Sequence, residues 1–235
     1  MNKSISENPV IHASQLSFSY LLGTPVLHIP EFTIQKGETL FLYGPSGSGK
    51  TTFLGLLSGI LNPTAGSLKV FGQEFANLPG KKKDLLRASN MGYIFQMFNL
   101  IPYLSVMENI ILPCRLNAQR RAKVRAPSLE EGAKKLAIHL NIEELLFKKV
   151  TELSVGQQQR VAAARALLGA PRLVIADEPT SALDTDRREQ FLKLLFAECE
   201  EAESALIFVS HDRTLMPLFS RSMSLLELNS TQGVK

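Results

Sequence analysis

A glycine-rich stretch of this chain has the residue types that bind a nucleoside triphosphate. Glycines let successive backbone N–H groups turn inward on a phosphate, and a helix N-terminus adds positive potential. Lys50 can place a charge on the β- and γ-phosphates, and the Thr51 hydroxyl can bind Mg²⁺. The stretch lies between an apolar run, Thr39–Tyr43, and a helical pattern, Thr51–Leu61, as such a loop requires. It reads Gly44, Pro45, Ser46, Gly47, Ser48, Gly49, Lys50, Thr51, Thr52.

Polar groups also follow three other apolar runs, each of which is typical of a buried strand. Asp177 and Glu178 follow Leu173–Ala176. Such strand ends meet at the carboxyl edge of a parallel sheet, where α/β proteins bind ligands. Asp177 can hold Mg²⁺ through water, and Glu178 can orient and deprotonate an attacking water. The alternative is that these two acids merely cap the next helix.

Gln96 and His211 occupy similar positions, after the runs Met91–Phe95 and Ala205–Val209. The Gln96 amide could reach Mg²⁺ or the water, and the His211 imidazole would lie near a γ-phosphate. A single glutamine or histidine is weak evidence by itself, and position after a strand is what favours function here. The remaining histidines lack that setting and are interpreted as surface or packing residues; they are His12, His28 and His139.

A second helix start, Leu153–Arg160, also looks suited to an anion. The segment has no phosphate-binding lysine of its own, which suggests that another surface completes the site.

The elements that position these residues alternate between strands and helices, so the chain is predicted to be an α/β protein with a mostly parallel sheet covered on both faces. Leu78–Ser89 and Asp186–Glu200 are predicted helices, and Met223–Leu228 is predicted to be the last strand. The helix-rich middle is interpreted as an insertion. One domain is expected, with a core at 1–96 and 166–235 and a helical subdomain at about 97–165.

Composition agrees with one globular domain. The chain has 235 residues, of which 45% are hydrophobic and 20% charged. A net charge of +4 is too small to argue for nucleic acid, and none is expected as a partner. The two cysteines fit no metal spacing and are interpreted as reduced thiols. No run of about eighteen apolar residues occurs, so any membrane role must come through a partner.

Together these motifs resemble the ATP-binding-cassette (ABC) ATPases, over about Ile11 to Leu228. The resemblance implies a P-loop NTPase fold with a RecA-like core, an N-terminal antiparallel β part and the inserted helical subdomain. It also implies ATP and Mg²⁺ as cofactors and a head-to-tail homodimer that encloses two ATP molecules. Ser154, Gly156 and Gln157 would then contact the γ-phosphate of ATP held by Lys50 of the partner subunit. Asp184 would couple the two sites.

Two positions leave alternatives open. Tyr20 stands where the family has an aromatic that stacks on adenine, with Phe18 as the second choice, and either could instead be a core residue of an edge strand. Val155 replaces the first glycine of the usual Leu-Ser-Gly-Gly-Gln signature. Valine would be costly there if φ were positive and tolerable if the residue were already helical.

The Val155 variant and the run Met91–Pro113 resemble one branch of the family, which powers lipoprotein release and macrolide or peptide export. The resemblance implies a separate transmembrane permease and a peripheral location at the cytoplasmic face of the plasma membrane. The apolar segment after Gln96 would be the permease contact, the alternative being that it fills the helical insertion. That segment comprises Phe98, Leu100, Ile101, Pro102, Tyr103 and Leu104.

A basic stretch is interpreted first as a solvated helix face and second as a contact for anionic lipid. It comprises Arg115, Arg120, Arg121, Lys123 and Arg125. Two other classes of function are less consistent with the sequence. One is a soluble cassette ATPase acting on DNA or ribosomes, and the other is a non-catalytic dimerisation module. The first usually has two cassettes in one chain or long coiled coils, and Glu178 and His211 argue against the second.

Overall fold

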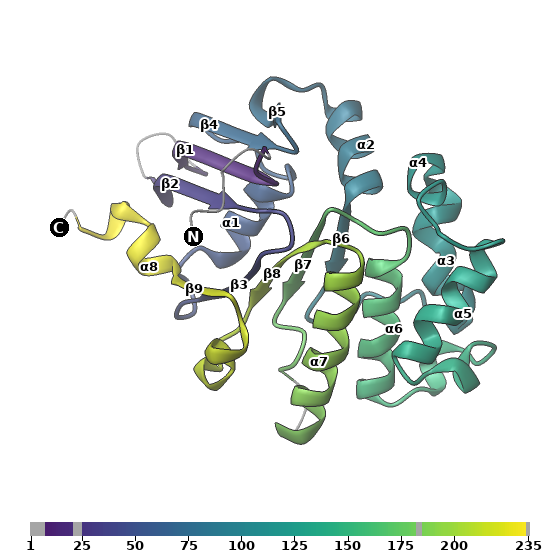
Figure 1. Cartoon of the computed structure of the whole chain (residues 1–235). Coiled ribbons are helices and arrows are strands. Elements are labelled where there is room, and N and C mark those ends of the chain that lie inside the picture. Colours follow the sequence, from purple (N-terminus) through teal and green to yellow (C-terminus); the bar gives the residue numbers. More distant parts are fainter. Residues whose placement is uncertain (1–7, 21–24, 182–184, 234–235) are drawn as a thin grey trace, which may run out of the picture.

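The computed structural model describes residues 8–20, 25–181 and 185–233. A parallel sheet lies at the centre, with strand order β6-β7-β8-β3-β9, and an antiparallel sheet of order β2-β1-β4-β5 lies beside it (Figure 1). The parallel strands are β3 (Thr39–Tyr43), β6 (Met91–Ile94), β7 (Leu173–Asp177), β8 (Ala205–Val209) and β9 (Arg221–Ser224). The antiparallel strands are β1 (Ile11–Phe18), β2 (Leu27–Ile34), β4 (Ala65–Val70) and β5 (Gln73–Glu74).

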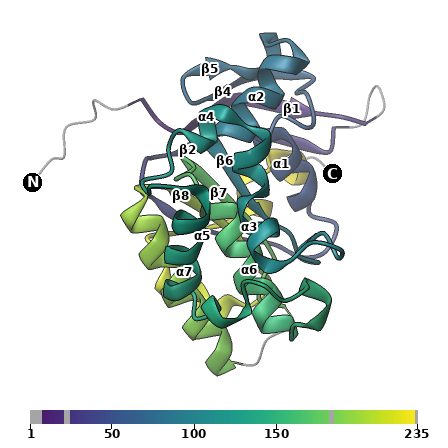
Figure 2. The same ribbon diagram turned by 90° about the vertical axis from the view of Figure 1, so that its right-hand side faces the viewer.

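Helices cover the parallel sheet and extend away from it. Those of the middle of the chain, α3 to α5, gather on one side of the molecule, as the turned view in Figure 2 shows. The helices are α1 (Lys50–Leu57), α2 (Gly80–Asn90), α3 (Val106–Leu116), α4 (Ala118–Arg121), α5 (Leu129–His139), α6 (Val155–Leu167), α7 (Thr185–Glu201) and α8 (Leu225–Leu228). Short 3₁₀ helices are η1 (Phe75–Asn77), η2 (Glu143–Leu145), η3 (Val150–Glu152), η4 (Arg213–Leu218) and η5 (Ser230–Gly233).

Two apolar clusters bury the two faces of the parallel sheet, because alternate residues of a strand point to opposite faces. In β3, Leu40 and Leu42 belong to the cluster that contains residues of α1 and the antiparallel sheet. Phe41 belongs to the other cluster, which contains residues of α3, α5, α6 and α7. Helices α1 and α6 therefore pack on opposite faces of the sheet.

The predicted α/β class, the parallel core and the N-terminal antiparallel part are confirmed. The prediction of one strand over Met223–Leu228 is wrong. Strand β9 ends at Ser224, and Leu225–Leu228 forms the helical turn α8. Leu225 and Leu228 are both buried, which a helix achieves at a spacing of three residues and a strand does not.

The division at about residue 165 stays a proposal. Helix α6, Val155–Leu167, runs through that boundary, and one continuous apolar cluster joins its residues to the middle helices and to the sheet. The middle helices and α6 therefore share one apolar core.

Candidate functional site

The glycine-rich loop joins β3 to α1 and is shaped by backbone that only glycine adopts easily. Gly47 and Gly49 have φ of 79° and 96°, and Gly49 is the residue before the helix. Gly44 is needed for a different reason. A Cβ added there would lie 2.7 Å from Ser48 Oγ, so the Ser48 side chain would have to shift. Ser48 itself is buried, and its Oγ has no hydrogen-bond partner among the described residues.

Lys50 is the first residue of α1, and its side chain turns back over the loop. Its Nζ donates hydrogen bonds to the carbonyl oxygens of Gly44 and Pro45, at 2.8 and 2.9 Å. This holds the ammonium above the loop's N–H groups, where an anion would lie. Thr51 is exposed beside it, and Thr52 is buried.

Tyr20 reaches the same loop. Its phenol oxygen lies 3.0 Å from Thr52 Oγ1, and its ring is 63% exposed. Phe18 packs edge-on against Tyr20, at 4.8 Å between ring centroids, but is buried in the core. Of the two aromatics, only Tyr20 has a face available for a base.

Asp177 and Glu178 lie at the carboxyl edge of the sheet, where β7 pairs with β8. Asp177 ends β7, and Glu178 adopts φ of 46° with its N–H donating to the Val209 carbonyl. A positive φ in a glutamate is unfavourable by about 1 kcal/mol or more, so tertiary structure imposes it. The turn aims the Glu178 carboxylate at His211, whose Nδ1 lies 3.4 Å from Glu178 Oε2.

His211 follows β8, whose end is held by a hydrogen bond from Ser210 N–H to the Leu42 carbonyl at 3.3 Å. The imidazole is mostly exposed. Thr180, Ser181 and His211 line an open cavity of about 530 Å³. Ser181 lies within the described residues, whereas Asp184, which the resemblance predicts to couple the two sites, lies outside them.

Gln96 is exposed two residues beyond the end of β6. Because Ile94 pairs with Ala176, the register places Gln96 level with Glu178 at the same edge. The structure thus gathers Lys50, Asp177, Glu178, Gln96 and His211 around one edge of the sheet. No contact of Gln96 with these groups is among those described.

The electrostatics of this edge favour a cation. Burial raises the pKa of Asp177, the neighbouring Glu178 charge raises it further, and Lys50 lowers it. Lys50 thus only partly offsets the negative charge of the two adjacent carboxylates. A divalent cation bound by Asp177 would compensate this charge, so the residues present fit Mg²⁺.

The second helix start is α6, with Ser154 as its N-cap. Ser154 and Gln157 form a capping box: Gln157 N–H donates to Ser154 Oγ at 3.4 Å, and Ser154 N–H donates to Gln157 Oε1 at 2.9 Å. This leaves the Ser154 hydroxyl proton and the Gln157 NH₂ group as donors directed to other partners.

Val155 is the first residue of α6, and it is not among the residues with positive φ. The valine therefore occupies a helical conformation that it tolerates, which answers the question raised by the missing glycine. Gly156 does not have positive φ either. Glycine at this position is therefore not required by an unusual dihedral angle.

Arg165, which the sequence analysis did not single out, ties α6 to the segment after Gln96. Its guanidinium donates to the carbonyl oxygens of Phe98 and Asn99, each at 2.6 Å. Phe98 and Asn99 have φ of 58° and 48°, so this turn is strained. The buried Asn109 side chain holds the next turn through hydrogen bonds with the N–H and carbonyl of Ile101.

The apolar segment after Gln96 is partly buried and partly exposed. Phe98 is buried in the insertion, whereas Tyr103 is 77% exposed. Phe147, which the sequence analysis missed, is 88% exposed. Backbone pairing of Ser105 with Lys149 brings the Phe147 segment beside the Tyr103 segment.

The interpretation of the basic stretch as a solvated face is wrong for Arg120. Only 3% of Arg120 is exposed, and its guanidinium donates to the carbonyls of Met91, Ala166 and Leu168. Lys123 likewise donates to the Ser89 carbonyl and to Asn90 Oδ1. These two residues cap helix ends. The carbonyls at those ends attract cationic side chains more strongly than the exposed helix face does.

Comparison with known proteins decides what this site belongs to. A family model described as "ABC transporter" matches residues 27–181. The chain belongs to the ABC transporter family. It is 36% identical over 222 residues to the lipoprotein-releasing system ATP-binding protein LolD 2 of Rhodospirillum rubrum, covering 93% of this chain and 94% of that protein. It is 40% identical over 210 residues to the uncharacterized ABC transporter ATP-binding protein YvcR of Bacillus subtilis, covering 87% and 79%.

Solved structures agree with this family. The chain matches a dimeric, post-hydrolysis structure of the ATP-binding cassette MJ0796 bound to ADP and Pi, with a TM-score of 0.77. The sequences are 31% identical, and the match covers 91% of this chain and 93% of that one. This chain is accordingly an ATP-binding subunit of an ABC transporter and an ATPase. Within residues 8–20, 25–181 and 185–233, the structure has no helix long and apolar enough to span a membrane.

Proposed function

We propose that two copies of this chain enclose two ATP molecules and drive a separate permease in a transporter of the lipoprotein-release or export type. The observation that carries the shared site is the placement of α1 and α6 on opposite faces of the parallel sheet. The loop before α1 has a lysine, and the start of α6 has donors without one. A second copy brings the two halves together at one phosphate.

Each copy would hold its ATP through the loop from Gly44 to Thr52. Pro45 has no backbone N–H, so the N–H groups from Ser46 to Thr52 donate to the phosphates. Lys50 neutralises the β- and γ-phosphates. Tyr20 would stack on the adenine, with its phenol kept in place by Thr52. Mg²⁺, bound by Thr51, Asp177 and Gln96, would supply charge stabilisation at the transferred phosphate.

Hydrolysis would follow from the paired Glu178 and His211. Glu178 orients a water in line with the γ-phosphate and accepts its proton as the oxygen attacks phosphorus. The bond to the β-phosphate oxygen breaks, which gives ADP and inorganic phosphate. His211, held at 3.4 Å from Glu178, donates to a γ-phosphate oxygen. Ser154, Gly156 and Gln157 of the second copy complete the shell of donors around the developing charge.

The permease contact is proposed at the segment after Gln96. Its exposed aromatic Tyr103 and the adjacent Phe147 offer apolar surface suited to a short helix of a membrane protein. Arg165 links this surface to α6, so a change at the second anion site would reach the permease. Binding to that permease would place the chain peripherally at the cytoplasmic face of the inner membrane.

The role of Glu178 is tested by Glu178→Gln, which keeps the shape of the side chain and removes its basicity. Phosphate release from Mg-ATP should fall by at least 100-fold while ATP still binds. Glu144→Gln is the matched control, because Glu144 is an exposed glutamate away from this edge. Phosphate release at the wild-type rate in Glu178→Gln would show that another group activates the water.

The permease proposal is tested by capture of membrane proteins with the full chain from detergent-solubilised membranes of its source. Tyr103→Ser together with Phe147→Ser should abolish co-purification of a permease without changing basal ATP hydrolysis. Leu116→Ser is the control, because Leu116 is equally exposed but lies at the far end of α3. Unchanged capture by the double variant would place the contact elsewhere.

A further inference from the structure

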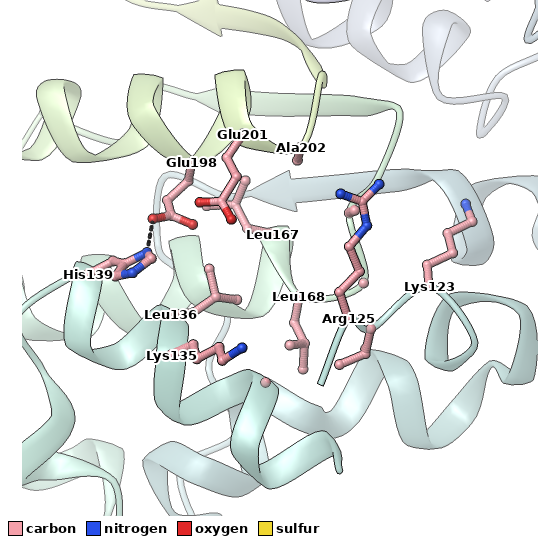
Figure 3. A pocket seen from close by; sticks show the side chains of 14 residues that line it. Lys123, Arg125, Lys135, Leu136, His139, Leu167, Leu168, Glu198, Glu201 and Ala202 are labelled. Atoms are coloured by element: carbon pink, nitrogen blue, oxygen red, sulfur yellow. Dashed lines mark hydrogen bonds and ion pairs between the residues drawn. The ribbon is translucent and has the colours of Figure 1, made fainter. Parts of the chain in front are cut away.

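A cavity outside the nucleotide site lies between α5, α6 and α7. It has a volume of about 140 Å³, and its floor is formed by Leu136, Leu167 and Leu168. One end carries His139, Glu198 and Glu201, and Figure 3 shows these three side chains converging there. Lys123 and Arg125 lie toward the other end of the same cavity (Figure 3).

We infer that His139, Glu198 and Glu201 form a binding site for Zn²⁺ that joins α5 to α7. Among the residues that the structure describes, this is the one group of three His, Cys, Asp or Glu side chains placed to share an ion. Their nearest ligand atoms all lie within 4.8 Å of one another. The sequence setting of His139 predicts an ordinary surface or packing residue, whereas this site would give its imidazole the role of a metal ligand.

Glu198 is the one buried member of the group. It is 8% exposed, and its Oε1 lies 2.7 Å from His139 Nδ1. Its other oxygen, Oε2, makes no hydrogen bond or ion pair in the described part of the chain. Figure 3 shows this second oxygen on the side of the Glu201 carboxylate. This oxygen is not among the buried unpartnered atoms of the described residues, so it is open to the cavity, where a cation between the two carboxylates can reach it.

Electrostatics at this end agree with the geometry. Burial raises the pKa of Glu198, the hydrogen bond and charge of His139 lower it, and Glu201 raises it again. Glu198 and Glu201 are three residues apart on α7, so they share one helix face. Arg125 and Lys135 also line the cavity, and Lys123 is bound to Ser89 and Asn90 on its other side.

The donor set selects the metal. Mg²⁺ and Ca²⁺ prefer shells made of oxygen, whereas an imidazole nitrogen with carboxylate oxygens suits Zn²⁺. Three protein ligands and one water are a common zinc arrangement, with ligands about 3.4 Å apart at bond lengths near 2.1 Å. His139 and Glu201 are exposed, so each can move the ~1 Å that this requires.

Competing thiol ligands are not available nearby. Cys199 adjoins Glu198 in sequence, but it is buried, and burial raises its pKa to about 12. Its thiol is not one of the three side chains that converge at this end of the cavity. Cys114 is buried as well.

The test is calorimetric titration of the nucleotide-free full chain, without an affinity tag, with zinc sulfate at pH 7.5. The wild type should bind one equivalent of Zn²⁺ saturably, and His139→Ala and Glu201→Gln should each weaken binding by at least tenfold. Both changes are at exposed positions, and circular dichroism checks that the variants fold. Millimolar Mg²⁺ should not displace the zinc.

His12→Ala is the matched control. His12 Nδ1 lies 3.3 Å from Glu31 Oε1, which gives a partly exposed histidine–glutamate pair that has no third ligand among the described residues. Its loss should leave zinc binding unchanged. The inference would be overturned by no saturable binding to the wild type, by unchanged binding in both His139→Ala and Glu201→Gln, or by an equal loss in His12→Ala.

Discussion

Arg165 should control the shape of the segment that follows Gln96. The change to test is Arg165→Ala, which removes two hydrogen bonds of 2.6 Å to the carbonyls of Phe98 and Asn99. Both carbonyls belong to residues with positive φ, which by themselves prefer another conformation. The turn therefore depends on the guanidinium rather than on local preference.

The size of the effect follows from these bonds. Hydrogen bonds to a charged group contribute about 1.5–3 kcal/mol each, but the exposed Asn99 carbonyl regains a bond to water in the variant. A net loss of about 2 kcal/mol in unfolding free energy is expected, which is roughly 4–8 °C in Tm for a domain of this size. Relief of strain in the freed turn would make the loss smaller, not larger.

The assay combines calorimetry with amide hydrogen exchange of residues 97–101. Exchange there should rise by at least tenfold in Arg165→Ala, and the rate of ATP hydrolysis should fall because the turn that follows Gln96 is loosened. Arg160→Ala is the control on the same helix, since within the described residues Arg160 donates one hydrogen bond, to the Leu140 carbonyl at 3.2 Å. Unchanged exchange at residues 97–101 in Arg165→Ala would show that the guanidinium does not hold this turn.

Two other variants separate stability from activity. Because burial and Glu178 raise the pKa of Asp177 above its ordinary 3.8, the contribution of Asp177 to stability is present below that value and is lost as the pH rises through its raised folded pKa. Asp177→Asn should thus have an equal or higher Tm at pH 7 by calorimetry, while Mg-ATP hydrolysis falls at least 100-fold; a lower Tm with intact hydrolysis would contradict this. Val155→Gly should leave ATP hydrolysis within twofold and lower Tm by about 1–2 °C, since glycine is a poorer helix residue than valine, and a large gain in activity would show that Val155 limits the site.

The buried strands were predictable from sequence because their apolar runs have no other stable location. Strands β3 and β8 begin and end at the predicted residues, Thr39–Tyr43 and Ala205–Val209. Their ends determine where the following polar residues lie. The sequence therefore led to the right sheet edge for Asp177 and His211 without any knowledge of tertiary contacts.

Other features depend on contacts between distant residues, which periodicity does not report. The burial of Arg120 requires carbonyls of β6 and α6 that lie 29 to 48 residues away in the chain. The role of Arg165 likewise depends on a turn 66 residues earlier. Leu225–Leu228 is apolar enough for a strand, and only the shape of the surrounding core makes it a helix.

The most direct test of the shared ATP site is the molar mass of Glu178→Gln in solution, measured by light scattering during gel filtration. If two copies share each ATP site, Glu178→Gln should be a monomer without nucleotide and a dimer with Mg-ATP. Adding Gly156→Asp, which places a negative charge at the start of α6, should keep the chain monomeric while ATP still binds to the glycine-rich loop. A monomer with ATP in Glu178→Gln, or a dimer that persists with Gly156→Asp, would contradict the claim that each site is completed by a second copy.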